Sequence, residues 1–339
     1  MIERGVGMSK MRLTIQHNGV LLEPPVESGV KIEWERTGYP GKMTFTVIKV
    51  DSGWVEFVEG DPVCFYYDNK PVFAGYIFTK KRTREHKIDI TCYDQLRYFK
   101  NKYTYLFENK TATQIVQSLA ADFKLTTGTM DNTGYVIPTV LHENKSAFDI
   151  ALDAIEETLT NTGNMFVLYD DCGKLCLKNT ANMVSNNLIF EDSAENLDYS
   201  SSIDDETYNS VVLYYQEDED KTDDKANTQT KNKKIQVYSA SDQTSMQAWG
   251  TLRYFEEVKN KTIAQNKANE LLKLYNKKTR ELKVTGAFGV PNVRAGTLIP
   301  VKLNLGDIQV NNFMLVEKVT HNYEAGHHTM DLTLEGAWE

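Results

Sequence analysis

The chain has 339 residues, of which 41% are hydrophobic and 25% charged, and its net charge at pH 7 is −9. This length and composition are those of a globular protein with two or more domains. The negative charge argues against a dedicated nucleic-acid-binding protein, and no apolar run reaches the roughly 20 residues that a membrane-spanning helix needs. Four cysteines are too few for a disulfide framework and fit free thiols in a reducing compartment.

Residues 11–98 are expected to be almost entirely β-strands. Their segments alternate polar and apolar residues or are rich in β-branched side chains, and turn signals such as Pro40-Gly41 separate them. The segments are RLTIQ, VKIEWER, KMTFTVIKV, PVCFYY, VFAGYIFTK and KIDITCYD. The pattern predicts an antiparallel β domain.

The middle of the chain, residues 99–202, predicts a small α/β domain. Apolar residues recur at helical spacing over residues 115–123 and again over residues 148–159. Two short strands, NMFVLYDD and GKLCLKN, follow and are expected to form a hairpin that turns at Cys172-Gly173.

The chain returns to β structure after Tyr208, with strands predicted in NSVVLYYQ and KKIQVYSA. Residues 217–233 between them contain no large apolar side chain, and ordering them would cost roughly 1–2 kcal/mol per residue in backbone entropy with little compensating burial. We expect a mobile loop there. A helical pattern follows at residues 264–275, and strands are expected again from Val284 onward.

Three Asn-Lys-Ser/Thr triplets resemble glycosylation sites, but each stands at the head of a predicted helix. The hydroxyl of the third residue can accept a hydrogen bond from the first helical turn, and a Gln or Asp follows three residues later at capping-box spacing. The start of the chain has no apolar segment typical of a secretory signal, which also favours capping. The predicted pairs are Thr111 with Gln114, Ser146 with Asp149, and Thr262 with Gln265.

A three-strand pattern occurs near the start of the chain and again at its end. Both copies, residues 60–94 and 296–336, open on glycine and close on an alternating strand. Phe73 and Phe313 lie where the middle strand of each copy is expected to start. The pattern predicts an internal duplication, although two unrelated meanders stay open as an alternative. If the copies fold alike, a ring of three chains would present six similar faces.

No catalytic, cofactor-binding or metal-binding residues are predicted. Cys172 and Cys176 lack a second ligand pair at zinc-site spacing, and the histidines His321, His327 and His328 lack a carboxylate-histidine signature. The acidic pairs occur in turns or in the charged segment, where Asp is common because it stabilises turns. We therefore expect neither an enzyme nor a cofactor.

Two aromatic residues, Trp54 and Phe57, stand in a polar connection, DSGWVEFVEGD, within the first β domain. An aromatic side chain in such a segment either completes the core or anchors an interface with a partner. Both alternatives stay open, and Trp54 and Phe57 are the candidate interaction residues.

Ordered segments spread over residues 12–336 identify a family. They include GYPGKMTFTV, EGDPVCFYYDNKPVFAGYIF, KIDITCYDQLRYFKN and NKTATQIVQSL. They continue with NKSAFDIALDAIEETLTNTGNMFVLYDDCGKLCLKN, KANELLKLYNKKTRELKVTG, VRAGTLIPVKL and FMLVEKVTHNYEAGHHTMDLTLEG. The set resembles the baseplate hub proteins of phage tails and contractile injection systems, the XkdQ-type and late-control gene D group.

The resemblance implies an α+β, mainly β fold with two antiparallel β-barrel domains like those of tail-tube proteins. These barrels would comprise residues 11–98 and residues 203–239 combined with 284–336. Peripheral domains would follow, α/β at residues 99–202 and helical at residues 240–283.

Such hubs are homotrimers whose barrels form a pseudo-sixfold ring. The ring joins the six-fold tail tube to a trimeric spike and nucleates tube assembly. The implied partners are further copies of the chain, tail tube protein and spike protein, with baseplate wedge and tape-measure proteins as additional neighbours. No membrane or specific nucleic-acid partner is implied.

The resemblance also implies synthesis in the bacterial cytoplasm and assembly into the tail or baseplate of a released phage or bacteriocin-like particle. Two other functions stay open. One is a host-surface glycan-binding tail module, in which Trp54 and tyrosines would stack on sugars. The other is a tail-associated glycan hydrolase that uses paired carboxylates.

Overall fold

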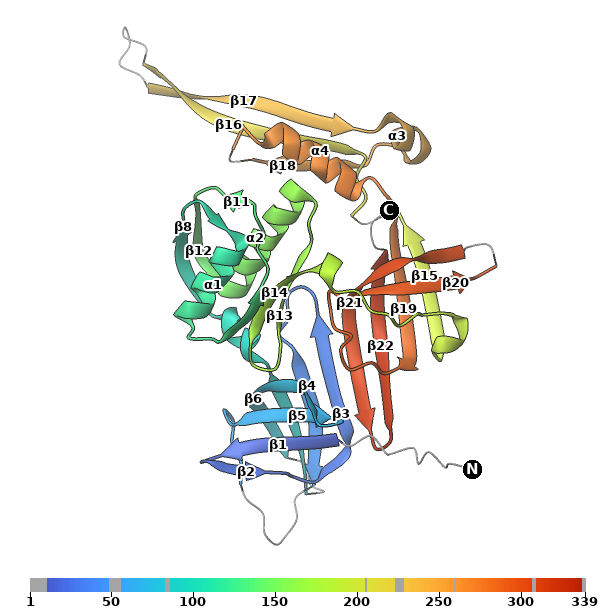
Figure 1. Cartoon of the computed structure of the whole chain (residues 1–339). Coiled ribbons are helices and arrows are strands. Elements are labelled where there is room, and N and C mark those ends of the chain that lie inside the picture. The colour runs from blue at the N-terminus through green and yellow to red at the C-terminus, as the bar shows by residue number, and fades with distance from the viewer. Residues whose placement is uncertain are drawn as a thin grey trace. The chain divides into compact units, whose positions relative to one another are not determined.

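The computed structural model describes residues 11–48, 56–82, 86–204, 206–222, 229–258, 260–306 and 309–336. Strands dominate, as Figure 1 shows, so the expected mainly β fold is confirmed. The chain divides into two compact units. Unit 1 comprises the residues up to 156, residues 165–199 and the residues from 281 on, and unit 2 comprises residues 157–164 and 200–280.

The first β domain folds as its alternating sequence predicts. In β4 and β7, for example, every second side chain is buried, because successive residues of a strand point to opposite faces. The strands pair in the order β3-β4-β7-β6-β5-β1-β2. Their bounds are β1 (Met11–His17), β2 (Val20–Leu22), β3 (Val26–Glu35), β4 (Lys42–Ile48), β5 (Pro62–Tyr67), β6 (Lys70–Arg82) and β7 (Lys87–Tyr93).

A second set of antiparallel strands continues the same sheet in the order β15-β19-β22-β21, and β20 pairs with the first half of β21. The second half of β21 pairs with β3, so one 12-stranded sheet contains both sets. Their bounds are β15 (Asn196–Ser202), β19 (Thr279–Phe288), β20 (Leu298–Asn304), β21 (Gln309–Glu324) and β22 (His327–Gly336).

One hydrophobic core serves both sets of strands. Ile32 and Phe45 of the first set belong to the same buried cluster as Val284 and Leu332 of the second. Because each such side chain stabilises the fold by about 1.5–3 kcal/mol when fully buried, the two sets are expected to fold together.

The predicted α/β domain lies between the two sets of strands in the sequence. Amphipathic α1 buries Ile115, Val116 and Leu119 in a cluster that also contains the apolar side of the hairpin β13–β14. The hairpin turns at Cys172 and Gly173, both with positive φ, as predicted. The helices are η1 (Gln95–Lys100), α1 (Ala112–Asp122), α2 (Ala147–Thr162), η2 (Thr180–Asn182) and η3 (Glu191–Ser193). The strands are β8 (Lys102–Phe107), β9 (Lys110–Thr111), β10 (Thr127–Met130), β11 (Val136–Ile137), β12 (Val140–Ser146), β13 (Phe166–Asp170) and β14 (Leu175–Asn179).

Unit 2 contains a three-stranded sheet in the order β17-β16-β18, with its own core. Val211 and Leu213 of β16 pack in one buried cluster with Ala268 and Leu271 of α4. The elements are β16 (Ser210–Thr222), β17 (Gln229–Ser241), α3 (Gln243–Trp249), β18 (Arg253–Glu257) and α4 (Ala264–Tyr275).

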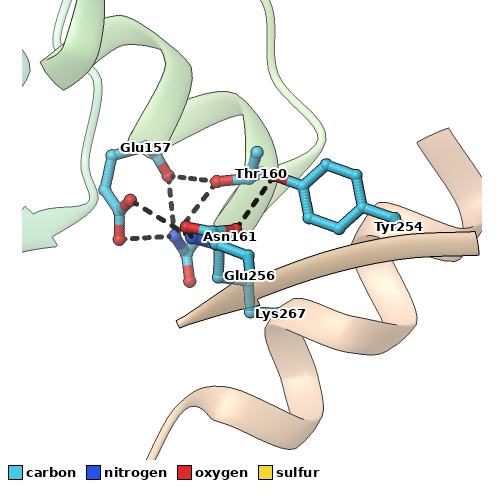
Figure 2. Close-up of polar contacts among 6 residues, drawn as sticks. All are labelled: Glu157, Thr160, Asn161, Tyr254, Glu256 and Lys267. Carbon is cyan, nitrogen blue, oxygen red and sulfur yellow. Dashed lines mark hydrogen bonds and ion pairs between the residues drawn. The ribbon is translucent and has the colours of Figure 1, made fainter. Parts of the chain in front are cut away.

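An ion-pair cluster around Lys267 lies within unit 2 (Figure 2). Lys267 Nζ is 3.0 Å from Glu256 Oε1 of β18 and 3.9 Å from Glu157 Oε2 near the end of α2. Tyr254 donates a hydrogen bond to Glu256 at 3.0 Å, and Asn161 Nδ2 donates to the carbonyl oxygen of Glu157 at 2.7 Å. The Lys267 side chain is only 11% exposed, so the two carboxylates compensate a charge that is largely removed from water.

The assignment of residues 203–239 to the second barrel is wrong. β16 pairs with β17 over its whole length and with β18 in parallel, and this sheet is separate from the 12-stranded one. For the same reason, residues 240–283 do not form a separate helical domain: α3, β18 and α4 accompany this hairpin. The strand that completes the second set is β15, from the segment that was assigned to the α/β domain.

The loop expected at residues 217–233 is shorter than predicted. β16 extends to Thr222 and β17 begins at Gln229, with the ladder continuing from Glu217 opposite Lys234 to Thr222 opposite Gln229. The backbone ladder therefore extends beyond the apolar residues from which the strands were predicted.

Two of the three predicted helix caps are confirmed. Thr111 caps α1 in a reciprocal capping box, and the Asp149 N–H donates to the Ser146 hydroxyl at 3.1 Å at the start of α2. The prediction for Thr262 is wrong, because α4 starts after Ile263, which supplies no side-chain cap.

None of the helices in the described part of the chain combines the length and the apolar character that crossing a bilayer requires.

Candidate assembly site

The two predicted copies have the same strand topology. We call β3 to β7 module 1, and β15 with β19 to β22 module 2. In module 1 the meander β5-β6-β7 is followed in the sheet by β4 and then β3. In module 2 the meander β20-β21-β22 is followed by β19 and then β15. The order of strands along the chain matches as well, which supports the predicted duplication.

The same turn opens both meanders. The Gly60 N–H donates to the carbonyl oxygen of Ile77 at 2.8 Å, and the Gly296 N–H donates to that of Val316 at 2.8 Å. Both glycines have positive φ, 94° and 89°, which a residue with a Cβ adopts only at a cost. The residue after each glycine accepts a hydrogen bond through its side chain from the N–H three positions earlier, Asp61 from Val58 and Thr297 from Arg294.

The same bulge interrupts both middle strands. Pairing with the last strand skips one residue after Ile77 in β6 and one residue after Val316 in β21. The register beyond the bulge then makes Asp89 and Asp331 counterparts. Each carboxylate bonds to the neighbouring strand, Asp89 with the Thr46 hydroxyl and Asp331 with the Gly286 N–H, both at 2.9 Å.

This register corrects one predicted correspondence. Phe73 is buried, whereas Phe313 is 44% exposed, so the two side chains point to opposite faces. Counting from Ile77 and Val316, the counterpart of Phe313 is Ala74. An additional irregularity in the β5–β6 pairing skips Val72, so the residues of β6 before Phe73 are shifted by one position relative to β5.

Module 1 and module 2 meet where β3 pairs with the second half of β21. The backbone ladder runs from Glu35 opposite Lys318 to Val30 opposite Tyr323. The Arg36 N–H extends it by donating to the carbonyl oxygen of Glu317 at 2.8 Å, and Arg36 Nε donates to the Glu317 carboxylate at 2.5 Å. Both side chains are mostly buried, at 20% and 14% exposure, so this charge-assisted contact helps to fix the joint.

A cluster of aromatic rings and histidines lies next to the β3–β21 joint, on β21 and β22. His321 is fully buried, with its Nε2 2.8 Å from the carbonyl oxygen of Val293 and its Nδ1 2.9 Å from His328 Nε2. Tyr323 stacks on His328, and burial lowers the pKa of His321 to about 3 and that of His328 to about 4. Neutral histidines therefore act here as packed rings. No group of three metal-ligating side chains occurs among the described residues, and His327 is exposed.

A buried polar junction joins module 1 to the α/β domain and to the turn of module 2. Asp170 accepts from Gln95 Nε2 at 2.6 Å and from the Gly173 N–H at 2.7 Å. Arg294 donates from Nη1 to the Asp170 carbonyl oxygen at 3.0 Å, and its guanidinium lies 5.2 Å from the ring centre of Trp34. Asp94 accepts from the N–H groups of Gly41 and Leu96, at 2.8 and 3.0 Å.

Burial dominates the electrostatics of this junction. It raises the pKa of Asp170 to about 6, because the hydrogen bonds from Gly173 and Gln95 and the charge of Arg294 only partly offset desolvation. Burial and the nearby charge of Asp170 raise the pKa of Asp94 well above its ordinary value. The cavity beside these groups holds only about 10 Å³, which is hardly enough for one water molecule. The junction therefore packs domains together and has no room for a substrate.

The predicted interaction residues divide. Phe57 is only 1% exposed and belongs to the core, so it does not present an aromatic side chain to a partner in this structure. Its counterpart before the turn of module 2 is Val293, which is also 1% exposed. Trp54 lies outside the described residues, and its predicted role stays a prediction.

Two strand edges were not predicted from the sequence. β15 ends the 12-stranded sheet and pairs only with β19 among the described strands. Residues 79–82 of β6 pair with β7 on one side and have no described strand on the other. The sequence does not reveal these edges, because the residues of an edge strand resemble those of any exposed strand. The three-strand repeat was the only sequence feature that pointed to them.

The comparisons with known proteins agree with this architecture. A family model described as YQBQ-like matches residues 30–335. Two Bacillus subtilis (strain 168) proteins align over 316 residues, which is 91% of this chain and 91% of each relative. They are the uncharacterized protein YqbQ, 31% identical, and the phage-like element PBSX protein XkdQ, 30% identical.

Solved structures share the fold. The 43 kDa tail protein of prophage MuSo2 from Shewanella oneidensis matches with a TM-score of 0.68 and 12% identity, over 95% of this chain and 98% of that chain. The E. coli c3393 protein is described as a component of the type VI secretion system with structural similarity to the T4 bacteriophage tail proteins gp27 and gp5. It matches with a TM-score of 0.56 and 10% identity, over 97% of this chain and 77% of that chain. The family model and the two relatives show that the chain belongs to the YQBQ-like family.

Proposed function

We propose that the chain is the structural hub of a phage-type tail or contractile injection particle. Three copies would form a ring that joins the tail tube to the central spike and nucleates tube assembly. The observation that carries this proposal is the duplicated module: one chain holds two strand sets with the same topology, turn and bulge. The fold shared with a prophage tail protein and with a type VI secretion component supports it.

The duplication offers a way to match two symmetries. Three copies around an axis have three-fold symmetry, yet they carry six similar modules. A six-fold tube protein could therefore dock on the six modules, while a trimeric spike binds on the other side of the ring. Baseplate wedge and tape-measure proteins would be further neighbours, and we propose Trp54 as a residue that contacts one of these proteins.

The polar face of the sheet is the face left to line the central channel of such a ring. The other face is already covered by the core, for example at Ile32 and Phe45. The polar face carries charges of both signs, with Glu33 bridging Lys31 at 3.1 Å and Lys42 at 3.0 Å. A shallow hollow of about 320 Å³ lies on it across β21, β3, β4 and β7. Balanced charge would let cargo pass without binding tightly.

The assembled particle provides the test. The chain would carry an affinity tag in the bacterium that makes the particle, and purified particles would be imaged by electron cryomicroscopy. We expect a ring of three copies at the junction of tube and spike, with both modules of each copy facing the tube. Density for the chain along a fibre, inside the tube or on the host-facing surface as single copies would contradict the proposal.

A further inference from the structure

We propose that a single water molecule binds inside module 2 between the Tyr323 hydroxyl and His328 Nδ1, where it completes a directed chain of hydrogen bonds. The chain runs from the water through His328 and His321 to the carbonyl oxygen of Val293, just before the opening turn. This inference is independent of the proposed function, because it concerns the interior of one copy.

The carbonyl oxygen before the opening turn receives a side-chain hydrogen bond in both modules. In module 1, Lys80 Nζ of β6 donates to the carbonyl oxygen of Phe57. In module 2 the counterpart of Phe57 is Val293, and His321 Nε2 of β21 lies 2.8 Å from its carbonyl oxygen. A lysine carries only donors, so that contact ends there. A fully buried histidine has a second ring nitrogen, which must find a partner inside the protein.

These contacts fix the tautomers of both histidines. A carbonyl oxygen only accepts hydrogen bonds, so His321 donates to Val293 through its Nε2–H. Burial lowers the pKa of both histidines far below 7, and a neutral ring carries one N–H, so His321 Nδ1 is an acceptor. The donor that lies 2.9 Å from it is therefore the Nε2–H of His328. By the same count, His328 Nδ1 is an acceptor as well.

Two buried polar atoms of this cluster have no partner among the described residues, namely His328 Nδ1 and the Tyr323 hydroxyl oxygen. Tyr323 as a whole is fully buried. The first atom is an acceptor that needs a donor, and the second belongs to a hydroxyl that can donate. Buried groups of this kind are nearly always paired, often with an internal water, because leaving them unbonded costs free energy.

The arrangement of the rings requires a bridging group instead of a direct bond. The Tyr323 and His328 rings are stacked, with centroids 4.0 Å apart and planes inclined by 18°. A hydroxyl and a ring nitrogen form hydrogen bonds close to their ring planes, so stacked rings do not direct these atoms at each other. A water at the edge of the stack can accept from Tyr323 and donate to His328 Nδ1. The half-buried ring of Tyr67 contacts both rings, at 5.0 and 5.1 Å between centroids, and brings a second hydroxyl to the cluster.

The chain connects parts of module 2 that are distant in the sequence. His321 lies opposite Ile32 in the β3–β21 joint. Val293 precedes the opening turn and is followed by Arg294, which belongs to the buried polar junction. The water therefore completes a polar link from the joint to the turn within the hydrophobic core that both modules share.

The first test determines the tautomers by nitrogen nuclear magnetic resonance of the full-length chain with labelled histidines. We expect His321 and His328 both to be neutral at pH 7, with the proton on Nε2 and none on Nδ1. The signals that disappear in His321→Gln and in His328→Gln assign the two rings. A proton on Nδ1 of either ring would overturn the directed chain.

The second test uses the sign of a stability change. If the water bonds the Tyr323 hydroxyl, Tyr323→Phe removes a hydrogen bond and is expected to lower the thermal midpoint by about 1–4 °C. If the hydroxyl is unbonded, the same change removes an unsatisfied polar atom and leaves the midpoint unchanged or raises it, which would contradict the inference. Tyr103→Phe is the matched control, because Tyr103 is 64% exposed and its midpoint should move by less than about 1 °C.

A crystal structure of the full-length chain at high resolution locates the water directly. We expect one ordered water within hydrogen-bond distance of both the Tyr323 hydroxyl and His328 Nδ1, with reduced occupancy in Tyr323→Phe. A cluster without this water, or with a protein hydroxyl bonded directly to His328 Nδ1, overturns the inference and leaves the hub proposal standing.

Discussion

Modules 1 and 2 differ chiefly in what lies against the second half of the middle strand. In module 2, β3 covers this half of β21, and Arg36 and Glu317 close the contact with little exposure. In module 1, the same half of β6 ends at Arg82, whose ion pair with Glu56 is 51% and 67% exposed. The same turn and bulge thus support a joint with β3 in one module and, in the other, an edge that pairs with no described strand. The comparison teaches that the same strand topology can carry a neighbouring strand at this half of the middle strand in one module and, among the described strands, none in the other.

The largest expected loss of stability is at Phe57, a core position just before the opening turn whose counterpart in module 2, Val293, is buried as well. Replacing Phe57 by Ala would remove a buried aromatic ring and lower the free energy of unfolding by about 3–5 kcal/mol. Its neighbour Val58 is 42% exposed, so Val58→Ala is the control and should cost less than about 0.5 kcal/mol. Chemical denaturation measures both. Equal, small losses would show that Phe57 is an exposed anchor instead of a core residue.

The paired glycines sharpen the comparison next. Gly60→Ala introduces a Cβ at positive φ into open space, and is expected to cost about 1–2 kcal/mol. Gly296→Ala has the same strain, but its Cβ would also lie 2.7 Å from Val167 Cγ1 of the α/β domain. We expect an additional loss of about 1–3 kcal/mol from this overlap, seen as a lower thermal midpoint. If the two variants are equally stable, the turn of module 2 does not pack against the α/β domain as described.

The closed joint and the open edge can be compared through one carboxylate each. Glu317→Ala leaves the mostly buried Arg36 without its partner and is expected to lower the free energy of unfolding by about 1–3 kcal/mol. Glu56→Ala removes the partner of exposed Arg82 and should change it by less than about 1 kcal/mol. Urea unfolding of the two variants side by side measures the difference. A larger loss for Glu56→Ala would contradict this comparison of the joint with the open edge.

The last prediction concerns pH at the buried junction, where the effect changes gradually across a pH window. The folded-state pKa of Asp170, about 6, lies above the ordinary value of 3.8, so the folded chain binds more protons than the unfolded chain between these pH values. The contribution of Asp170 to stability therefore falls as pH rises from about 4 to about 6, by at most about 1.4 kcal/mol per pH unit.

Asp170→Asn should remove this contribution and make the stability of the variant rise relative to the parent over that window. Thermal midpoints at several pH values measure it. Asp171→Asn is the matched control: the Asp171 side chain is 61% exposed and its charge is only a minor cause of the raised Asp170 pKa, so this variant should change the profile far less. Parallel profiles for the parent and Asp170→Asn would contradict a raised pKa.

The regular strands and helices were predictable because their periodicity reports local structure. β4 and β7 alternate residue by residue, and α1 carries an apolar stripe behind a capping box. β15 was missed because only Leu197 and Tyr199 face the core in a strand of otherwise polar residues, and its partner β19 is far away along the chain. The outer part of the β16–β17 hairpin was missed because its strands lack the apolar residues that usually reveal a strand.

The assembly site was predictable in part for similar reasons. Gly60 and Gly296 marked the repeat, because a turn with positive φ restricts the residue type. Bulges shift side chains from one face to the other without changing composition, so Phe73 and Phe313 looked equivalent when they are not. The open edges involve no special residue at all. They are defined by the lack of a neighbouring strand among the described residues, which only the comparison of the two modules revealed.

The molar mass of the purified full-length chain in solution is the most direct test of the central claim that three copies of a chain with a doubled strand set form a closed ring. Size-exclusion chromatography with light scattering over a concentration series gives this mass. We predict a discrete species at three times the 38.7 kDa of one chain, without larger open polymers. A chain that remains at 38.7 kDa at every concentration, or that forms a two-fold dimer, would contradict it.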